Sequence, residues 1–231
     1  MNEKMKMMKR REFSALLSTP LALGGLSLAP QLALAQTDPF AGKYQTLAQA
    51  LPVAVPGKIE VVEFFWYGCP HCYAFEPVLA PWIKQLPADV AFRRVHVGFN
   101  AMIKLHQRLF YALEALGKAA ELQDKIFNAF HELRLDLNDE KSITELVVKL
   151  GVDGAKFKDA YNAFGVVTKA GQGSKLSEAY RIDGVPALGI GGRYLTSPSI
   201  AGLRGDNEQA NGRRALAVAD HLIQLARASK G

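Results

Sequence analysis

The chain has 231 residues, of which 49% are apolar and 22% charged, and only two are cysteines. This composition excludes disordered and fibrous proteins, and two cysteines are too few for a disulfide-rich scaffold or a four-cysteine metal site. The formal net charge is +6, but residues 1–35 carry +3 of it, and the charges of the remaining chain nearly balance. Because that part also has no Lys/Arg cluster interleaved with aromatic residues, we expect no nucleic-acid partner.

Residues 1–35 have the three parts of a secretory signal peptide. A basic start precedes an apolar stretch from Phe13 to Leu34, and Ala33-Leu34-Ala35 forms a small-x-small cleavage site. The alternative is an uncleaved membrane anchor, but two prolines and a Gly-Gly pair interrupt the apolar stretch and weaken a spanning helix. We therefore predict cleavage after Ala35 and a soluble mature protein outside the cytoplasm, where disulfides persist.

The basic start is compatible with two export routes. Lys9-Arg10-Arg11-Glu12-Phe13 resembles a twin-arginine signal in its two arginines and the Phe after them. It departs from the usual pattern, since Lys9 stands where Ser or Thr is preferred and Ser14 follows Phe13. An ordinary basic start that happens to contain Arg-Arg explains the segment equally, so the Sec and twin-arginine routes both stay open.

Residues 36–57 are predicted to form an extended arm with one short helical stretch, from Tyr44 to Leu51. The nearly continuous apolar run from Lys58 to Trp66 predicts a strand covered on both faces. A second strand is expected from Val90 to Val97, and His96 within it is expected to be a satisfied core histidine. One helix separates the two strands, which predicts a βαβ unit with parallel strands.

From Met102 to about Tyr180 the apolar residues recur at helical spacing and predict a block of five helices. The third helix is expected to begin near Ser142, where Ser142 and Glu145 have capping-box spacing. Asp153 is a predicted N-cap for the fourth helix, and the last one is expected from about Val166 to Tyr180.

After Arg181 the sheet pattern returns. The runs 185–190 and 193–196 flank Gly191-Gly192, which predicts a β-hairpin closed by a two-residue turn. A C-terminal helix is expected from Asn207 to Ala228. The predicted order is therefore βαβ, an all-helical block, and ββα.

Cys69-Pro70-His71-Cys72 follows the first predicted strand and opens the helix after it. A thiol at a helix N-terminus lies near unpaired N–H groups and the positive end of the helix dipole, both of which favour the thiolate. A protonated His71 would add a positive charge, and Pro70 fits the first helical turn. We therefore expect the pKa of Cys69 to lie well below the free-thiol value of about 8.5.

A low thiol pKa predicts what the cysteine pair can do. A stable thiolate is a good leaving group, so the Cys69–Cys72 disulfide should be easy to reduce and should oxidise other thiols. Cys69 is predicted to be the exposed sulfur that forms the mixed disulfide. Cys72, one turn later and more buried, is the predicted resolving partner.

Three alternatives to a redox pair are weaker. A structural disulfide would gain little from closing so small a loop. A zinc site would need two more ligands, and none of the histidines is paired with another at ligand spacing, the candidates being His71, His96, His106, His131 and His221. A chance C-x-x-C is the third alternative, and the strand–turn–helix context and the export signal argue against it.

The segment from Glu63 to Glu76, EFFWYGCPHCYAFE, together with residues 184–187, GVPA, resembles the DsbA family of bacterial thiol:disulfide oxidoreductases. CPHC combined with a Val-Pro motif is far more specific than C-x-x-C alone. The resemblance implies an α/β protein with a thioredoxin fold and an inserted all-helical domain. It assigns residues 36–100 and 181–231 to the two parts of the thioredoxin-like domain, and residues 101–180 to the insertion.

The resemblance also implies a periplasmic disulfide oxidase that transfers its Cys69–Cys72 disulfide to exported reduced or unfolded proteins. A membrane quinone reductase of the DsbB type would reoxidise it. We expect a monomer that needs no metal or other cofactor. Two alternatives stay open: a periplasmic thiol reductase or isomerase on the same fold, and a peptide-binding chaperone that uses an apolar surface.

Further residues take roles from the resemblance alone. Pro186, preceded by Val185, matches the family's cis-proline, which lies against the active-site disulfide and binds extended substrate through backbone groups. Glu63 matches a buried acid that relays protons for the Cys72 thiol, and the alternative is an exposed strand-end Glu, like Glu60. Pro77 matches the proline that kinks the active-site helix, and no chemistry is assigned to it.

Overall fold

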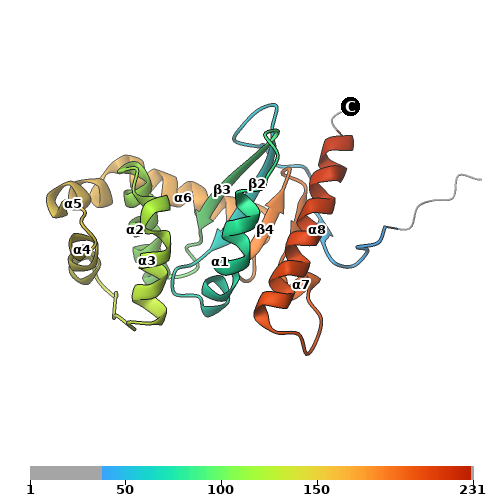
Figure 1. The fold of residues 1–231 in the computed structure, drawn as a ribbon. Helices are drawn as coiled ribbons and strands as arrows, with labels where there is room; N and C mark the ends of the chain where they lie inside the picture. The colour runs from blue at the N-terminus through green and yellow to red at the C-terminus, as the bar shows by residue number, and fades with distance from the viewer. Residues whose placement is uncertain (1–37, 230–231) are drawn as a thin grey trace, which may run out of the picture. The chain divides into compact units, whose positions relative to one another are not determined.

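The computed structural model describes residues 38–229, and the predicted signal peptide lies outside this range. Five strands form one mixed sheet in the spatial order β1-β5-β4-β2-β3 (Figure 1). The strands are β1 (Gln45–Thr46), β2 (Ile59–Phe65), β3 (Val90–His96), β4 (Ala187–Ile190) and β5 (Tyr194–Thr196). The two halves of the sheet come from chain segments that are separated by a long helical stretch.

The helices occupy three stretches of the chain. One lies between β2 and β3, five lie between β3 and β4, and two follow β5. They are α1 (Pro70–Ile83), α2 (Ala101–Ala115), α3 (Ala119–His131), α4 (Glu140–Lys149), α5 (Gly154–Asn162), α6 (Phe164–Ala179), α7 (Pro198–Ala201) and α8 (Glu208–Ala228). We call α2 to α6 the helical block. Among residues 38–229, no helix is both long enough and apolar enough to cross a bilayer.

β2 lies between β3 and β4 and is buried along all seven of its residues. It pairs in parallel with β3 and antiparallel with β4, and α1 makes the connection from β2 to β3. The predicted βαβ unit is therefore confirmed. A strand that is hydrogen-bonded on both edges and covered on both faces needs a continuous apolar run, which residues 58–66 supply.

The hairpin of β4 and β5 is confirmed, with a correction to its connection. Gly191 and Gly192 occupy the centre of a turn that is closed by the Arg193 N–H donating to the Ile190 carbonyl at 3.0 Å. Both glycines have positive φ, and a side chain on Gly192 would collide with the Leu51 carbonyl. Because Ile190 pairs with Tyr194, the connection has three residues and not the predicted two.

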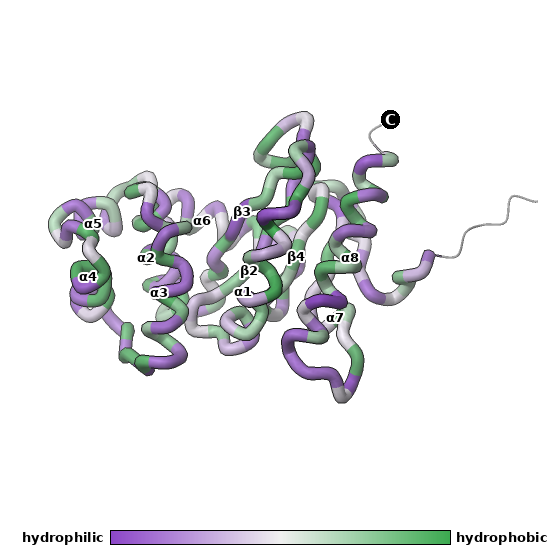
Figure 2. The backbone as a smooth tube through the Cα atoms, in the orientation of Figure 1, coloured by the Kyte–Doolittle hydropathy of each residue, from purple (hydrophilic) through white to green (hydrophobic). Residues whose placement is uncertain are grey.

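The two faces of the sheet are covered by different helices. α1 and α8 pack together on one face, where apolar residues of both helices join those of β2 and β4 in one cluster. On the other face Val62 and Phe64 of β2 contact a cluster that includes Tyr180, directly after α6, and Ile103 of α2. In Figure 2, β4 is largely hydrophobic, whereas α8 alternates between hydrophobic and hydrophilic residues as expected for a helix with one buried side.

The helical block has an apolar core, and residues before and at the start of α1 take part in it. This core joins residues of α2 to α6 with Phe65, Tyr67, Cys69 and Cys72. The cysteine pair therefore lies where the sheet and the helical block meet.

Two predicted details of the block are affected by the structure. α4 begins at Glu140, near the predicted start at Ser142, but the capping box is formed by Asp139 as N-cap and Ser142 as the third helical residue, and not by Ser142 and Glu145 as predicted. Asp153 does cap α5, since its side chain accepts a hydrogen bond from the Lys156 N–H at 2.9 Å.

The predicted helical stretch from Tyr44 to Leu51 is also wrong. Residues 45–46 form β1, which pairs with β5, and the chain after it continues along the hairpin. The Leu47 N–H donates to the Arg193 carbonyl at 2.8 Å and the Leu51 N–H to the Gly192 carbonyl at 2.7 Å. Backbone partners supplied by the distant hairpin thus outweigh the local helical preference of this segment.

Candidate active site

The cysteine pair lies at the start of α1, as predicted. Cys69 is the N-cap residue with extended backbone, and Pro70 is the first helical residue. A turn between β2 and α1 sets this position, because the Cys69 N–H donates to the Trp66 carbonyl at 3.0 Å. Cys69 is only 6% exposed and Cys72 is fully buried. The prediction that Cys69 is an exposed sulfur was therefore wrong, although it is the more accessible of the two.

The Cys69 sulfur faces the loop before β4. The sulfur lies 3.3 Å from the Val185 carbonyl oxygen, which accepts a hydrogen bond from it when Cys69 is protonated, and the bond from Val185 to Pro186 is cis. The two cysteines are not bonded to each other, so the structure is the dithiol form. Cys69 and Val185 are 116 residues apart in the chain, so the two segments that resemble the family motifs meet at one sulfur atom.

The pKa values of the two thiols are shifted in opposite directions. The pKa of Cys69 is lowered to about 6, first by a hydrogen bond from the Cys72 side chain, and then by the backbone N–H groups of Cys72 and His71, against the opposing effect of burial. Burial raises the pKa of Cys72 well above its ordinary value, and the hydrogen bond to Cys69 raises it further. At neutral pH the site therefore holds a Cys69 thiolate and a Cys72 thiol.

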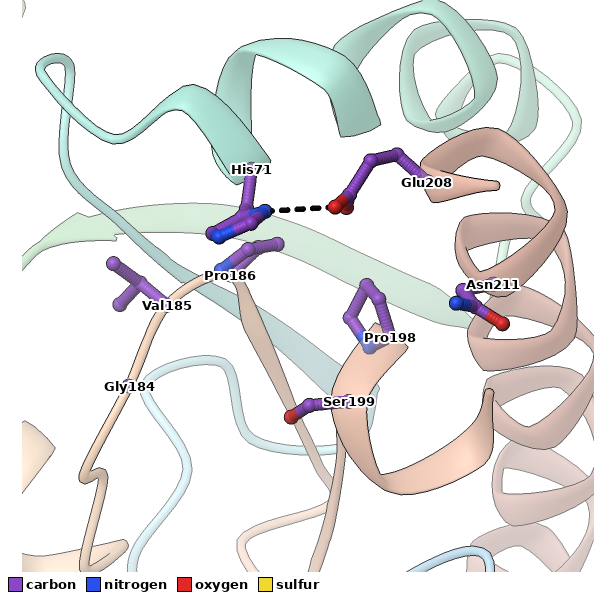
Figure 3. Close-up of a pocket in the computed structure, with 8 residues that line it drawn as sticks. All are labelled: His71, Gly184, Val185, Pro186, Pro198, Ser199, Glu208 and Asn211. Carbon is purple, nitrogen blue, oxygen red and sulfur yellow. Dashed lines mark hydrogen bonds and ion pairs between the residues drawn. The ribbon is translucent and has the colours of Figure 1, made fainter. Parts of the chain in front are cut away.

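His71 contributes least to this division. Its charge is the weakest of the influences that lower the pKa of Cys69. Its Nδ1 atom lies 3.0 Å from a carboxylate oxygen of Glu208, the first residue of α8 (Figure 3). The imidazole is thus held by a partner 137 residues away in the chain.

Arg94 of β3 lies between two buried carboxylates. Its Nε atom is 2.7 Å from Glu63 of β2, and its Nη2 atom is 2.6 Å from Glu76 of α1. Glu63 is fully buried, as is Glu60, whose side chain pairs with Arg93. The alternative that Glu63 is an exposed strand-end residue like Glu60 is therefore wrong for both residues.

The arrangement gives the site a proton-binding group near neutral pH. Burial raises the pKa of Glu63, and Arg94 opposes that effect. Burial and the charge of Glu63 raise the pKa of Glu76 to about 7. The charge of Glu63 in turn raises the pKa of Cys72, so the buried acid and the buried thiol influence each other even though no hydrogen bond joins their side chains within the described residues.

Three histidines hold Trp66 and Tyr67, the first two residues of the turn that leads to Cys69. The Nε2 atom of His96 accepts from the Tyr67 N–H at 3.3 Å, and the Nε2 atom of His131 donates to the Tyr67 carbonyl at 2.8 Å. The Nδ1 atom of His106 accepts from the Trp66 indole at 2.9 Å. His96 is fully buried and makes a second hydrogen bond to the Val97 carbonyl, which confirms it as a satisfied core histidine.

Comparisons with known proteins agree on one family. A family model described as a DSBA-like thioredoxin domain matches residues 60–207. The thiol:disulfide interchange protein DsbA of Bordetella pertussis is 42% identical over 220 residues, which cover 95% of this chain and 100% of that protein. The chain belongs to the DsbA family. The DsbA of Pseudomonas aeruginosa strain PAO1 is 40% identical over 197 residues, or 84% of this chain and 90% of that protein.

The comparison with solved structures extends to the fold. The crystal structure of Pseudomonas aeruginosa DsbA matches with a TM-score of 0.76 at 37% identity, over 82% of this chain and 95% of that one. The predicted α/β architecture, a thioredoxin fold with a helical insertion, is confirmed. So is the predicted activity class, since DsbA proteins are thiol:disulfide oxidoreductases with a redox cysteine pair.

Several residues of this DsbA-family site were not predicted from the sequence. Glu76 carried a usable signal, because it lies four residues after Cys72 and therefore on the same side of α1. Arg94 becomes visible only once the strand register is known, since β2 and β3 align Glu63 with Arg94. Glu208 and His131 carried no local signal, because each reaches the site from an element distant in the chain.

The order of influences on Cys69 predicts how two variants differ. Cys72→Ala should raise the pKa of Cys69 by about one to two pH units, since a hydrogen bond to a charged group is worth about 1.5–3 kcal/mol and one pH unit corresponds to about 1.4 kcal/mol. His71→Ser should raise it by less, and should lower the reduction potential because a less stable thiolate makes the disulfide harder to reduce. Ultraviolet absorbance of the thiolate, followed against pH in the reduced proteins, measures both shifts. A larger shift in His71→Ser than in Cys72→Ala would contradict the assignment.

Proposed function

We propose that this DsbA-family chain acts as an oxidase, which donates the Cys69–Cys72 disulfide to reduced proteins. The observation that carries the proposal is the contrast between the two thiols, with the pKa of Cys69 lowered to about 6 and that of buried Cys72 raised. A thiolate that is stable when the protein is reduced makes the reduced form favourable. The disulfide therefore passes readily to other thiols.

The reaction consists of two thiol–disulfide exchanges. A substrate thiolate attacks the Cys69 sulfur, the Cys69–Cys72 bond breaks, and Cys72 leaves as a thiolate that takes up a proton. A second substrate thiolate then attacks the substrate sulfur of the mixed disulfide, and Cys69 leaves as the stabilised thiolate. Two electrons move from substrate to protein, and the substrate gains one disulfide.

The residues around the pair take supporting roles in this proposal. The backbone of Val185 and Pro186, whose Val185 carbonyl contacts the Cys69 sulfur at 3.3 Å, would bind the extended substrate chain. Glu63 would exchange the proton of Cys72, an idea supported by its burial and its influence on the pKa of that thiol. Pro70 would preserve the first turn of α1, and His71 would add a positive charge beside the thiolate when protonated.

Localisation and partners follow from the family and the leader sequence. A chain that begins with a signal-like segment and belongs to a family of periplasmic oxidoreductases would meet newly exported, reduced proteins in the periplasm. Each cycle leaves the protein reduced, so a membrane quinone reductase of the DsbB type would restore the disulfide. No resident cofactor takes part in the exchange itself.

The direction of transfer is tested by a redox equilibrium. The purified chain is equilibrated with glutathione and glutathione disulfide at a series of ratios, and alkylation of free thiols measures the reduced fraction. We expect a reduction potential of about −180 mV or higher, in the range of oxidising family members. A value near about −270 mV, typical of thioredoxin, would assign the chain to the reductases instead.

A further inference from the structure

A cavity of about 320 Å³ is lined by Val185, the residue whose carbonyl contacts the Cys69 sulfur, and by His71. Figure 3 shows the residues that line it. Its walls come from four parts of the chain: His71 at the start of α1, residues 184–186 before β4, Pro198 and Ser199 of α7, and the first turn of α8. Because the Val185 carbonyl contacts the Cys69 sulfur, a substrate cysteine joined to Cys69 would lie at the edge of this cavity. An extended chain advances about 3.3 Å per residue, so a side chain one or two residues from that cysteine would reach into it.

The lining of the cavity is mostly uncharged and contains one carboxylate. Val185, Pro186 and Pro198 supply apolar surface, while Ser199 and Asn211 supply uncharged polar groups. Within the described residues, Glu208 is the only carboxylate in the lining. A side chain that combines an apolar stem with a cationic end matches both features, since lysine and arginine bury their methylene groups and present a charge at the tip.

Glu208 can exchange its present partner. It is 52% exposed and His71 is 61% exposed, so their contact is a surface pair that rearranges at little cost. The imidazole is charged only when protonated, whereas lysine and arginine carry a charge at every pH relevant to the reaction. A substrate lysine or arginine would therefore form an ion pair with Glu208 at every relevant pH, whereas His71 does so only when it is protonated.

We propose that Glu208 is a specificity-determining residue that favours substrates with lysine or arginine next to the reacting cysteine and disfavours substrates with an acid there. The inference rests on the proposed function, because it assigns a substrate preference to the same exchange reaction. Glu208 is proposed to affect which substrate binds. The reactivity of Cys69 itself is set by the side chain of Cys72 and by the N–H groups at the start of α1.

The experiment uses two series of reduced peptides, each with two cysteines. In one series the residue before the first cysteine is Lys, Gln or Glu, and in the other the residue after it is varied in the same way. Each peptide is oxidised by the full chain with glutathione disulfide as terminal oxidant, and kcat and KM are measured separately. We expect the Lys peptide of at least one series to exceed the Glu peptide about three- to tenfold in kcat/KM, mainly through KM.

Variants separate the charge of Glu208 from other effects. Glu208→Gln should bring the Lys-to-Glu ratio close to one, Glu208→Lys should reverse it, and added salt should reduce it in the wild-type chain. Asp206→Asn is the matched control, since Asp206 lies two residues away, pairs with Arg214 and does not line the cavity. This control should keep the wild-type ratio.

The possible failures are distinguishable. If the wild-type chain oxidises no peptide, the proposed function itself is wrong. If all peptides are oxidised at rates within twofold of each other, or if Glu208→Gln preserves a Lys preference, the function stands and the role of Glu208 is refuted. A change in Cys69 reactivity would alter all peptides by the same factor, so the ratio between peptides does not respond to it.

Discussion

Cys69→Ala should abolish the ability of this chain to restore disulfide formation in bacteria that lack their own periplasmic oxidase, while the wild-type chain should restore it. The reason is the division between the two thiols: Cys72 is fully buried, and its pKa is raised, so it cannot replace Cys69 as the sulfur that substrates attack. The measurement is the oxidation state of an exported reporter protein with a single disulfide. With Cys69→Ala, the oxidised fraction of the reporter should not exceed that in cells without the chain.

Cys72→Ala provides the complementary result. In this variant the Cys69 thiolate can still attack a disulfide of an exported protein, which breaks that disulfide and releases its other sulfur as a thiolate. Because Cys72 is absent and cannot attack the Cys69 sulfur to free the bound protein, covalent adducts should accumulate and should vanish on reduction. The double variant Cys69→Ala/Cys72→Ala should form none. Equal reporter oxidation by wild type and Cys69→Ala would refute the redox function and favour a peptide-binding chaperone.

Arg94→Met should destabilise the protein by about 3–5 kcal/mol at neutral pH, the usual cost of leaving a buried charge without its partner. Glu63 is fully buried and depends on Arg94, whose side chain is itself only 16% exposed. Removing the guanidinium also leaves Glu76 and Glu63 to repel each other. Urea denaturation followed by circular dichroism measures the loss.

The pH dependence identifies the cause of that loss. Burial raises the pKa of Glu63 in the folded state and Arg94 lowers it, so without Arg94 the folded-state pKa rises further above the unfolded value. The variant therefore gains more stability than the wild type when this buried carboxylate is protonated. The deficit of Arg94→Met relative to wild type should therefore shrink as the pH falls below 7. Arg214→Met, which breaks an exposed pair with Asp206, should cost about 0–1 kcal/mol. A deficit in Arg94→Met that stays constant with pH would mean that packing, and not charge, was lost.

Local sequence signals predicted much of this fold. The run from residue 58 to 66 could only satisfy its backbone and bury its side chains as an inner strand, and Cys69-Pro70 could start a helix because proline fits its first turn. Gly191-Gly192 predicted the hairpin because both positions have the positive φ that glycine adopts freely. In each case the cause lies within a few neighbouring residues.

The errors share a physical origin. Residues 44–51 follow a helical pattern, but the hairpin offers backbone partners that a local pattern does not reveal. The ion pairs of the site depend on strand register for Arg94 and on the packing of α8 for Glu208. The sequence pattern also did not reveal that the side chain of Cys72 is the main influence on the pKa of Cys69, because that depends on how the two sulfurs lie in the folded protein.

The histidine contacts to Trp66 and Tyr67 change how the helical block is to be understood. His106 belongs to α2 and His131 to α3, so residues that enter the chain after the βαβ unit hold the segment that leads into Cys69. The helical block therefore helps to fix the conformation of the turn that carries Cys69, in addition to forming the helical insertion of the fold. A change in the length or packing of α2 or α3 should therefore also move Trp66 and Tyr67, and with them the turn that carries Cys69.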